Sequence, residues 1–418
     1  MKRKSFITTF FAAAALLAAC GQGGGAHENA EIVTEITEPV EITFWHGMSG
    51  VPGDALAELT DRFEKDHPNI KVNLQNQGSY TDLQSKLTTT MQSPKDLPTL
   101  TQAYPDWLLG PIEDGDIVDL KPYIEHDQLK FNDYQDVIEG LRDGVAFDGK
   151  IYGIPFNKST EVLWYNKDIL DEVGAKIPTT FEELKEVSQL VYAKKGIPGV
   201  GFDSLPNFYV TYLKNKGVEF DSRLDVTGPE SEEAVKFYDE GVKEGYFRIA
   251  GTDNYMSGPF GNQQAAMYIG SNAGESFVKE GAEGKFEYGV APYPAKFALQ
   301  QGTDLYMFQQ ASPEQRTAAF EYMKFLTESD SQMEWATATG YMPVRTGVIN
   351  DPAYIGSGSH VAGILKDVQD LFSYPKEIGI GQAYNDVRPM METILTKKDA
   401  NIQDELGRFH STFQANFD

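Results

Sequence analysis

The sequence predicts an α/β fold with two lobes, because short apolar strands alternate with amphipathic helices along most of the chain. A strand is expected at 41–45, followed by a helix over 53–67 and a second strand over 70–76. A helix over 80–92 and a strand over 100–104 then complete a βαβαβ series. Such a series is typical of a parallel sheet covered by helices.

The first helix shows how these elements are identified. Ala55, Leu56, Leu59 and Phe63 recur at helical spacing and give the segment one apolar face. Pro68 cannot continue a helix and marks its end. We therefore expect this helix to pack against the sheet through that face.

The same rhythm begins again after Gly153. A strand is expected at 161–166 and a helix over 180–195, and Thr180 followed by Glu183 is the capping-box pattern of a helix start. A chain of 418 residues is large for one hydrophobic core and sufficient for two. The sequence therefore predicts two α/β lobes rather than one.

The N-terminal segment has the features of a bacterial lipoprotein signal. Positive residues at 2–4 precede an apolar run over 6–19, which is too short to span a bilayer. Small residues before Cys20 fit a lipobox, so we expect a signal peptide over 1–20, acylation of Cys20, and a flexible tether over 21–39. The alternative is an ordinary secretory signal that contains a cysteine. We expect a lipid-anchored protein on the extracellular face of the cytoplasmic membrane.

Composition excludes several classes of function. The net charge of -26 argues against binding to nucleic acid or to an anionic lipid surface. Cys20 is the single cysteine, so no disulfide is expected. We find no GxSxG, HExxH or P-loop pattern, and the six histidines are scattered. We therefore expect no enzyme, no metal and no cofactor, although a secreted hydrolase with two facing carboxylates stays an alternative.

Four segments resemble one family, the extracellular solute-binding proteins that serve ABC importers of sugars and glycerol phosphates. They are Ile42-Thr43-Phe44-Trp45-His46-Gly47-Met48, the stretch from Phe63 to Val72, the stretch from Ile154 to Asp168, and Gly340-Tyr341-Met342-Pro343-Val344. The resemblance implies a type II periplasmic-binding-protein fold with a hinge between the lobes. It also implies a small-molecule solute between the lobes, ABC permease subunits as partners, and a monomer.

The resemblance also implies how the chain is divided between the lobes. The N-lobe is expected to take residues 40–150 and 302–342, and the C-lobe residues 151–301 and 343–418. The crossings between them are expected near Gly153 and Gly340.

Within the family, the chain is most similar to the binders of glycerol-3-phosphate and glycerophosphodiesters. Four features carry this similarity: Phe44-Trp45-His46 with Met48, the turn Gly78-Ser79-Tyr80, Ala266-Met267 followed by the turn Gly270-Ser271-Asn272, and Asp386-Val387-Arg388. The resemblance implies ligand contacts at Tyr80, Asp106, Ser159, Ser271, Gly302, Tyr341 and Arg388. An arginine fork with serine hydroxyls suits a phosphate, and a glycine lets the backbone approach it closely.

Two departures from that pattern leave the ligand open between a glycerol phosphate and a sugar. Pro105 shifts the expected carboxylate to Asp106. The segment 202–208 lacks the two tryptophans of those proteins, so flat aromatic surface would have to come from Trp107 or from Phe202, Phe208 and Tyr209. Arg388 is also expected to open a C-terminal helix, where it could instead pair with Asp386. Trp45 and Trp164 are expected in the core.

Overall fold

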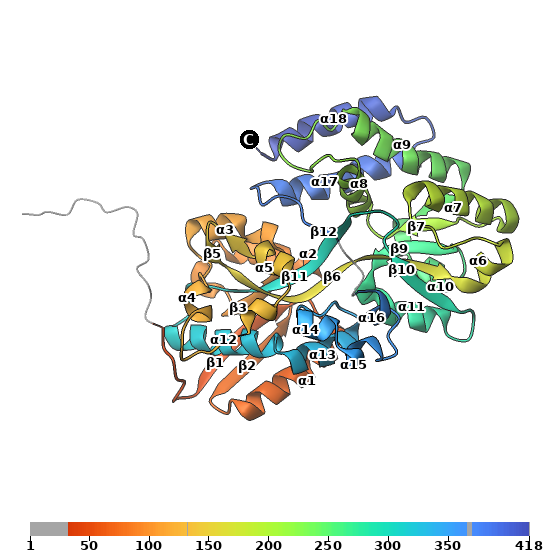
Figure 1. The fold of residues 1–418 in the computed structure, drawn as a ribbon. Helices are drawn as coiled ribbons and strands as arrows, with labels where there is room; N and C mark the ends of the chain where they lie inside the picture. The colour runs from red at the N-terminus through yellow and green to blue at the C-terminus, as the bar shows by residue number, and fades with distance from the viewer. Residues whose placement is uncertain (1–31, 132, 366–369, 418) are drawn as a thin grey trace, which may run out of the picture. The chain divides into compact units, whose positions relative to one another are not determined.

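A mixed ten-stranded sheet is the framework of the computed structural model, which describes residues 32–131, 133–365 and 370–417 (Figure 1). Along the sheet the strand order is β2-β1-β3-β11-β6-β9-β7-β8, with β10 paired to β6 and β12 paired to β11. The strands are β1 (Val40–His46), β2 (Ile70–Asn76), β3 (Leu100–Ala103), β6 (Gly153–Asn166), β7 (Val200–Phe202), β8 (Phe247–Ile249), β9 (Met267–Ser271), β10 (Tyr288–Pro292), β11 (Ala298–Met307) and β12 (Leu371–Phe372). A separate hairpin pairs β4 (Ala146–Phe147) with β5 (Lys150–Ile151).

Helices flank both parts of this sheet. Those before β6 are α1 (Val51–Asp66), α2 (Tyr80–Thr90), α3 (Leu109–Asp114), α4 (Lys121–Ile124) and α5 (Glu139–Gly144). Those between β6 and β11 are α6 (Lys167–Val173), α7 (Phe181–Lys195), α8 (Leu205–Asn215), α9 (Pro229–Glu244), α10 (Ser257–Gly261) and α11 (Glu275–Ala282). The remainder are α12 (Pro313–Leu326), α13 (Ser329–Thr339), α14 (Thr346–Ile349), α15 (Pro352–Ile355), α16 (Ala362–Leu365), α17 (Ile380–Thr396) and α18 (Ile402–Ala415).

The first part of the sheet confirms the predicted parallel βαβαβ unit. Strand β1 pairs in parallel with both β2 and β3. Phe44 of β1 and Phe63 of α1 are buried in one hydrophobic cluster with Phe320 of α12. These elements therefore share one core, and the predicted apolar face of the first helix faces that core.

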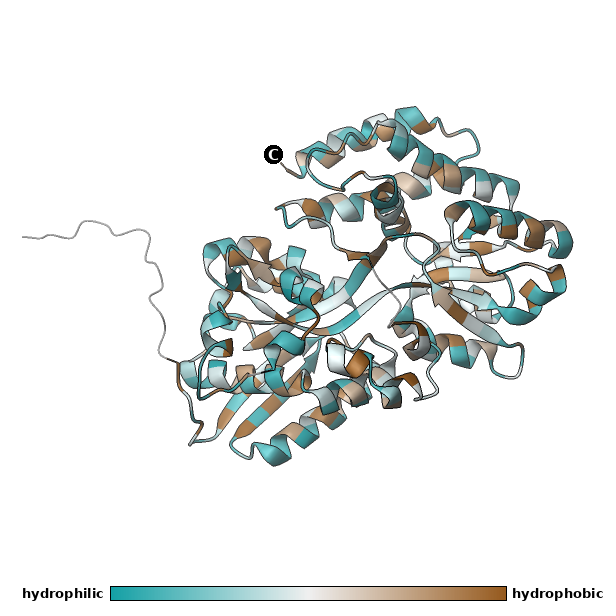
Figure 2. Ribbon diagram, in the orientation of Figure 1, coloured by the Kyte–Doolittle hydropathy of each residue, from teal (hydrophilic) through white to brown (hydrophobic). Residues whose placement is uncertain are grey.

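The second part of the sheet has a core of its own. Strands β9, β7 and β8 are parallel neighbours, and β9 pairs antiparallel with β6. Phe208 of α8, Met391 of α17 and Phe413 of α18 are buried in this second cluster. Figure 2 shows apolar residues along the strands and along one side of many helices. The two parts of the sheet thus pack against different hydrophobic clusters, two of the four in the described chain, in agreement with the two-lobed α/β fold that the sequence predicts.

Two strands, β6 and β11, run through both parts of the sheet. The first half of β6 pairs antiparallel with β11, and its second half pairs with β9 and β10. Strand β6 is therefore longer than the strand predicted at 161–166. The added residues 153–160 are buried and include a polar run with Asn157, Lys158 and Thr160. Partners more than a hundred residues away stabilise them as a strand, which local hydrophobic periodicity cannot reveal.

The helix starts predicted at 53, 80 and 180 agree with the observed ones to within two residues. Thr180 is the N-cap of α7, and its side chain accepts a hydrogen bond from the backbone N–H of Glu183 at 3.1 Å. The Glu183 carboxylate accepts from the N–H of Thr179 instead of that of the cap residue. Trp45 and Trp164 are buried, as predicted. None of the described helices is long and apolar enough to cross a membrane.

Residues 32–39, which the sequence assigns to the tether, contact the folded part of the chain. The Thr317 hydroxyl donates to the carbonyl of Val33, and the Asn69 amide donates to the carbonyl of Ile36. Ile32 and Ile36 also pack against the core around β1. Their aliphatic side chains explain why residues 32–39 pack on the fold ahead of the first strand, Val40–His46. The predicted signal peptide and Cys20 lie outside the described residues.

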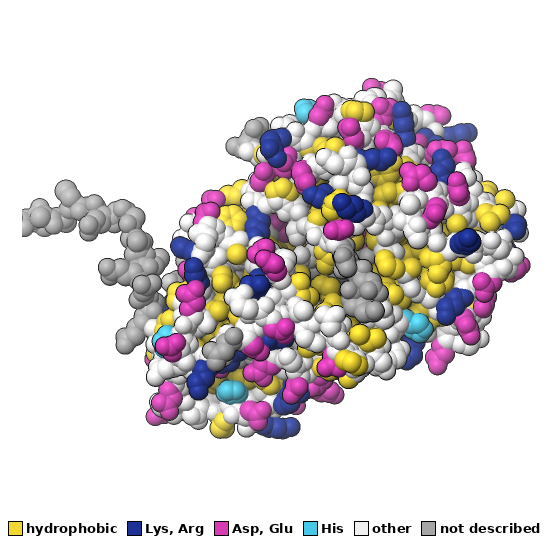
Figure 3. Space-filling view, in the orientation of Figure 1, with side chains coloured by type: hydrophobic (Ala, Val, Ile, Leu, Met, Phe, Trp, Pro, Cys, Tyr) yellow, Lys and Arg dark blue, Asp and Glu magenta, His cyan; other side chains and the backbone are white. Residues whose placement is uncertain are grey.

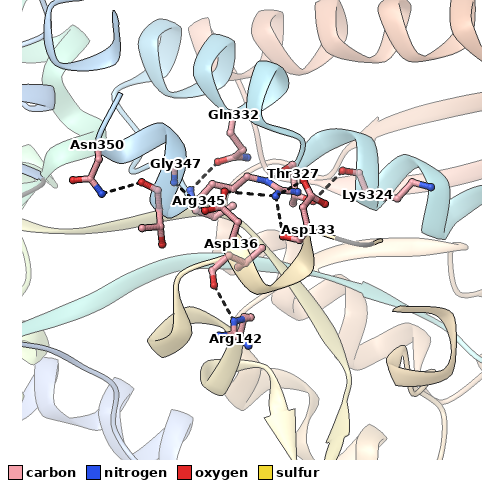
Figure 4. Close-up of polar contacts among 12 residues, drawn as sticks. Asp133, Asp136, Arg142, Lys324, Thr327, Gln332, Arg345, Gly347 and Asn350 are labelled. Atoms are coloured by element: carbon pink, nitrogen blue, oxygen red, sulfur yellow. Dashed lines mark hydrogen bonds and ion pairs between the residues drawn. The ribbon is translucent and has the colours of Figure 1, made fainter. Parts of the chain in front are cut away.

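Arg345 fixes the chain that follows α13 (Figure 4). Its buried guanidinium donates to the backbone carbonyl of Thr327 and pairs with the carboxylate of Asp133 at 2.7 Å. The carboxylate of Asp136 accepts from the N–H of Gly347 at 3.1 Å. These contacts join the segment 345–347 to the segment 133–136. The lobe boundary expected at residue 343 stays a prediction.

Candidate functional site

A continuous line of hydrogen bonds crosses the centre of the sheet. The Gln102 amide of β3 donates to the hydroxyl of Thr303 at 2.7 Å, and that hydroxyl donates to Asn157 Oδ1 at 2.7 Å. Asn157 Nδ2 then donates to the hydroxyl of Tyr80 at 2.9 Å, which lies 3.3 Å from the hydroxyl of Tyr341. We call this group the crossing cluster: Gln102, Thr303, Asn157, Tyr80 and Tyr341. Within it, the hydroxyls of the two predicted ligand residues, Tyr80 and Tyr341, are in hydrogen-bond contact.

Local structure holds each of these two tyrosines in place. Tyr80 is the first residue of α2, whose N-cap Ser79 forms a reciprocal capping box with Asp82. Tyr341 stacks on Trp335 of α13, with ring centroids 5.6 Å apart. Both tyrosine rings are half-buried, so part of each stays accessible to a solute. The burial of the Tyr80 and Tyr341 hydroxyls raises the pKa of both phenols, which keeps them neutral hydrogen-bonding groups.

Gly302 occupies a position on β11 that only glycine fits. Its φ of 87° is in the left-handed region, and a Cβ there would lie 2.0 Å from the carbonyl oxygen of Asn157. Its N–H donates to the Tyr104 hydroxyl, and its carbonyl accepts from Lys158 Nζ at 2.9 Å. A register shift follows between Thr303 and Asp304. The glycine therefore brings strands β6 and β11 into close contact beside the crossing cluster.

The two predicted serines lie on neighbouring strands. Ser159 of β6 is buried opposite Gln301, and Ser271 of β9 lies opposite Glu161 of β6. The Ser271 oxygen accepts from the N–H of Ala273 at 3.2 Å, which leaves its hydroxyl proton available to a solute.

Asn272 joins this serine turn to the return crossing of the chain. Its amide donates to the carbonyl of Gly340 at 2.6 Å and accepts from the N–H of Thr160 at 2.7 Å. Ser271 directly precedes Asn272, and Tyr341 directly follows Gly340. The hydrogen bond between Asn272 and Gly340 therefore brings Ser271 and Tyr341 to the same region of the molecule.

Asp106 lies in a setting that the sequence does not reveal. It follows β3, in the 3₁₀ helix Pro105–Leu108, and Oδ1 is 3.5 Å from the hydroxyl of Tyr374. A Cβ on Gly381 of α17 would lie 2.3 Å from Oδ2, so the carboxylate packs directly against that helix. Burial raises the pKa of the Asp106 carboxyl to about 6.

Aromatic rings surround this carboxylate on both sides. Tyr104 and Trp107 flank it in the sequence, with ring centroids 5.2 Å apart. Tyr374 stacks on Tyr384 of α17, with centroids 5.5 Å apart and an interplanar angle of 28°. All four rings are half-buried. Phe202, Phe208 and Tyr209, which the sequence offered as a replacement for the missing tryptophans, are instead buried in the core of the second lobe. Of the replacements considered, Trp107 is the partly exposed one.

Arg388 does not open a helix, in contrast to the prediction. It lies in the middle of α17, which begins at Ile380 because the apolar spacing extends further toward the N-terminus. Its side chain is 52% exposed, and among the described residues it pairs with Glu392 at 4.0 Å rather than with Asp386. Burial raises the pKa of the Tyr384 phenol, and the nearby charge of Arg388 opposes that rise. Residues 381, 384 and 388 therefore follow one face of the helix, from Asp106 past Tyr384 to the guanidinium.

A second polar group, missed in the sequence, adjoins this face. The carboxylate of Glu161 on β6 accepts a hydrogen bond from Asn207 Nδ2 at 3.0 Å. The amide oxygen of Asn207 in turn accepts a hydrogen bond from the Tyr384 hydroxyl. The second oxygen of Glu161 has no hydrogen-bond partner among the described residues. Burial raises the pKa of the Glu161 carboxyl to about 8, so it is largely neutral at pH 7. A glutamate inside an apolar strand is the sequence signal that could have indicated it.

The molecular surface offers less specific features. Figure 3 shows acidic and basic side chains interspersed over the face that it presents. An open groove of about 630 Å³ lies between α7 and α9, lined by charged residues that include Lys185 and Glu240, which pair at 2.9 Å. The groove touches none of the seven predicted ligand residues. Among the described residues, no group of acidic and histidine side chains has a metal-binding arrangement.

This fold and site define a two-lobed binding protein with a type II periplasmic-binding-protein fold. A family model for bacterial extracellular solute-binding proteins matches residues 58–358. The chain belongs to this family, whose members bind small molecules outside the cell and work with the permease subunits of ABC importers.

Individual relatives are more distant. The sn-glycerol-3-phosphate-binding periplasmic protein UgpB of Shigella flexneri is 26% identical over 338 residues, covering 76% of this chain and 75% of that protein. UgpB of Salmonella typhimurium is 26% identical over 327 residues, covering 73% and 74%.

Solved structures confirm the fold. The GacH receptor of Streptomyces glaucescens, which was solved unliganded and with acarbose, has a TM-score of 0.79 at 20% identity, covering 90% of this chain and 98% of that chain. UgpB from Mycobacterium tuberculosis in complex with glycerophosphocholine has a TM-score of 0.77 at 20% identity, with the same coverage. Maltose-bound MalE3 of T. maritima has a TM-score of 0.78 at 21% identity, covering 90% and 99%.

Proposed function

We propose that the protein captures glycerol-3-phosphate or a glycerophosphodiester outside the cell and delivers it to an ABC permease in the membrane. The observation that carries this proposal is the position of Arg388. Its guanidinium is half-exposed, has a single ion-pair contact among the described residues, at 4.0 Å to Glu392, and lies on the α17 face that leads to Asp106. An arginine without a close acidic partner among the described residues, near the neutral phenol of Tyr384, suits a phosphate.

The other predicted residues have complementary roles in this proposal. Ser271 and Tyr341 supply hydroxyl groups, and Tyr80 supports Tyr341 from the crossing cluster. Gly302 allows close packing of the strands around the site, and Ser159 lies beside it on β6. Asp106 would accept hydrogen bonds from hydroxyl groups at the other end of the ligand. The matched relatives that bind glycerol-3-phosphate support this assignment.

The arrangement of the whole molecule is part of the same proposal. Residues 40–150 and 302–342 would form one lobe, and residues 151–301 and 343–418 the other. Closure about the crossing strands would enclose the solute, a motion known for this architecture. We further propose a monomer held at the extracellular face of the cytoplasmic membrane by a lipid on Cys20.

A sugar is the second candidate solute. The observation that favours it is the row of half-buried aromatic rings at Tyr104, Trp107 and Tyr341, because flat rings stack on sugars and a nearby carboxylate accepts from their hydroxyls. In this case Arg388 would be a surface residue of α17 without a binding role.

Isothermal titration separates the two candidates. We expect glycerol-3-phosphate or glycerophosphocholine to bind, and Arg388→Ala to weaken binding about 10- to 100-fold, since a hydrogen-bonded charge contributes about 1.5–3 kcal/mol. Arg388→Lys should restore only part of the affinity because an ammonium lacks the planar fork. The control is Arg408→Ala on α18, an exposed arginine paired with Glu405 at 2.6 Å. Binding of maltotriose alone, unchanged in Arg388→Ala, would overturn the phosphate proposal.

A further inference from the structure

The segment between β12 and α17, residues 373–379, is attached to the part of the molecule that contains α17. Glu377 Oε2 accepts a hydrogen bond from the N–H of Ser222 at 2.9 Å. Gly379 has a φ of 92°, and a Cβ there would lie 1.9 Å from the carbonyl oxygen of Asn416, which follows α18. The segment then leads directly into α17, whose buried residues share one hydrophobic cluster with those of α8 and α18. It is therefore held on the side of the second sheet part.

Lys376 reaches from this segment to the other side of the molecule. Its ammonium donates to the carbonyl of Asp143, in the last turn of α5, at 2.5 Å and to the carbonyl of Ala146 in β4 at 2.6 Å. The ammonium also lies 5.8 Å from the ring centroid of Phe147. Phe147 packs against a different hydrophobic cluster, which contains buried residues of α2 and β3. Lys376 therefore joins elements that belong to two different clusters.

The same segment contacts a predicted ligand residue. The hydroxyl of Tyr374 lies 3.5 Å from Asp106 Oδ1, and Gly381, at the start of α17, packs against the other oxygen of this carboxylate. Arg388 lies seven residues, or about two turns, further along α17. The separation between Asp106 and Arg388 therefore depends on how closely α17 lies against the 3₁₀ helix that contains Asp106.

The chemistry of the Lys376 contacts suits an attachment that can open and close. Hydrogen bonds from a charged donor favour the joined state by about 10- to 100-fold. Burial lowers the pKa of the Lys376 ammonium, and the nearby carboxylates of Asp143 and Asp304 oppose that change. Because Lys376 is only half-buried, water can replace the two carbonyls when the elements separate. An apolar contact of the same size would have to expose its surface to water instead.

We infer that residues 373–379 form a latch, closed by Lys376, which holds α17 against the segment 143–147 before any solute binds and thereby sets the affinity for the solute. This inference rests on the proposed function, because it takes closure of the two lobes as the step that completes the site. The apparent affinity falls in proportion to the fraction of molecules in the binding-competent arrangement. A latch that populates this arrangement in advance therefore strengthens the binding of every solute that needs it.

Small-angle X-ray scattering of the solute-free protein tests the latch without any assumption about the solute. Lys376→Met keeps the aliphatic stem and removes the ammonium. We expect its radius of gyration to exceed that of the wild type by about 1 Å, on a value of about 22 Å for a compact chain of this length. The matched control is Lys397→Met, just beyond the other end of α17, where the exposed lysine pairs with Glu405 at 3.3 Å. Equal radii for wild type and Lys376→Met would overturn the inference.

Isothermal titration with glycerol-3-phosphate and with maltotriose tests the effect on affinity. We expect Lys376→Met to weaken each solute that the wild type binds by the same factor, about tenfold or more, because the latch acts on closure and not on the solute. Lys376→Arg should recover most of this loss, since a guanidinium can also donate to both carbonyls, and its recovery would show that the loss does not come from misfolding. Unchanged affinities in Lys376→Met would contradict the latch.

The pattern of losses separates the latch from the proposed function. A loss confined to glycerol-3-phosphate, with maltotriose unaffected, would make Lys376 a direct phosphate contact, and the latch would be wrong. If neither solute binds the wild type, the proposed function fails, and the comparison of the solute-free radii alone decides whether the latch exists.

Discussion

The buried carboxyl of Glu161 should make the stability of the fold depend on pH, and Glu161→Gln should remove that dependence. Glu161 is 1% exposed, and one of its two oxygens has a partner among the described residues, the amide of Asn207 at 3.0 Å. Glutamine has the same shape and keeps an oxygen for Asn207 to bind. It cannot ionise, so the variant isolates the effect of the charge.

The size of the effect follows from the shift of the pKa. Burial raises the pKa of the Glu161 carboxyl from 4.5 to about 8. Between these two pH values the folded state holds a proton that the unfolded state has released, so the free energy of unfolding falls as pH rises. At about 1.4 kcal/mol per pH unit, the decrease approaches about 5 kcal/mol at pH 8 and levels off above it. Below pH 4.5 the contribution is constant.

Urea unfolding of the ligand-free protein at pH 5, 6, 7 and 8 measures this dependence. We expect wild type and Glu161→Gln to have similar stability at pH 5, and the variant to be more stable by several kcal/mol at pH 8. Burial also raises the pKa of the Asp203 carboxyl to about 7. Asp203 is present in both proteins, so the difference in their stability reports on Glu161. Glu182→Gln, an exposed change on α7, is the control. Parallel stability curves from pH 5 to pH 8 would refute the reasoning.

Two further predictions concern the crossing strands. Gly302→Ala should destabilise the fold by about 3 kcal/mol or more in urea unfolding, because residue 302 has a left-handed φ and the new Cβ would clash with the carbonyl of Asn157. The control is Gly110→Ala, which should cost little because its Cβ would have open space. Lys158→Met should cost about 3–5 kcal/mol because it leaves the buried carboxylate of Asp304 without its partner at 3.0 Å. The double variant Lys158→Met with Asp304→Leu should recover most of that loss, and an equally unstable double variant would contradict this explanation.

The sequence was most informative where a structural signal is local. The apolar spacing from Ala55 to Phe63 and the proline that follows define α1, which ends at Asp66. Thr180 indicates the start of α7 because a cap hydrogen bond joins residues three apart. The parallel order of β1, β2 and β3 also follows from the sequence, since strands separated by helices have few ways to pair.

Tertiary structure decided which side chains meet. The hydroxyls of Tyr80 and Tyr341 are 261 residues apart in the chain and 3.3 Å apart in space. Asp106 and Tyr374 are separated by 268 residues, and nothing near either one in the sequence indicates the other. Arg388 was expected at a helix start, but it lies eight residues after Ile380, the first residue of α17, on the face that passes Tyr384. The family resemblance pointed to individual positions, but not to the rings that surround Asp106.

The amino-acid sequence by itself thus determined the α/β elements, the parallel order of β1, β2 and β3 and, through its family motifs, the class of protein. These depend on periodicity, caps and motifs within a few residues of one another. The structure alone decided that β6 and β11 carry a buried polar line through the sheet, and that Glu161 and Asp106 occupy sites of raised pKa. The physical reason is that burial and partnership arise from packing between segments that lie tens to hundreds of residues apart, which no local pattern records.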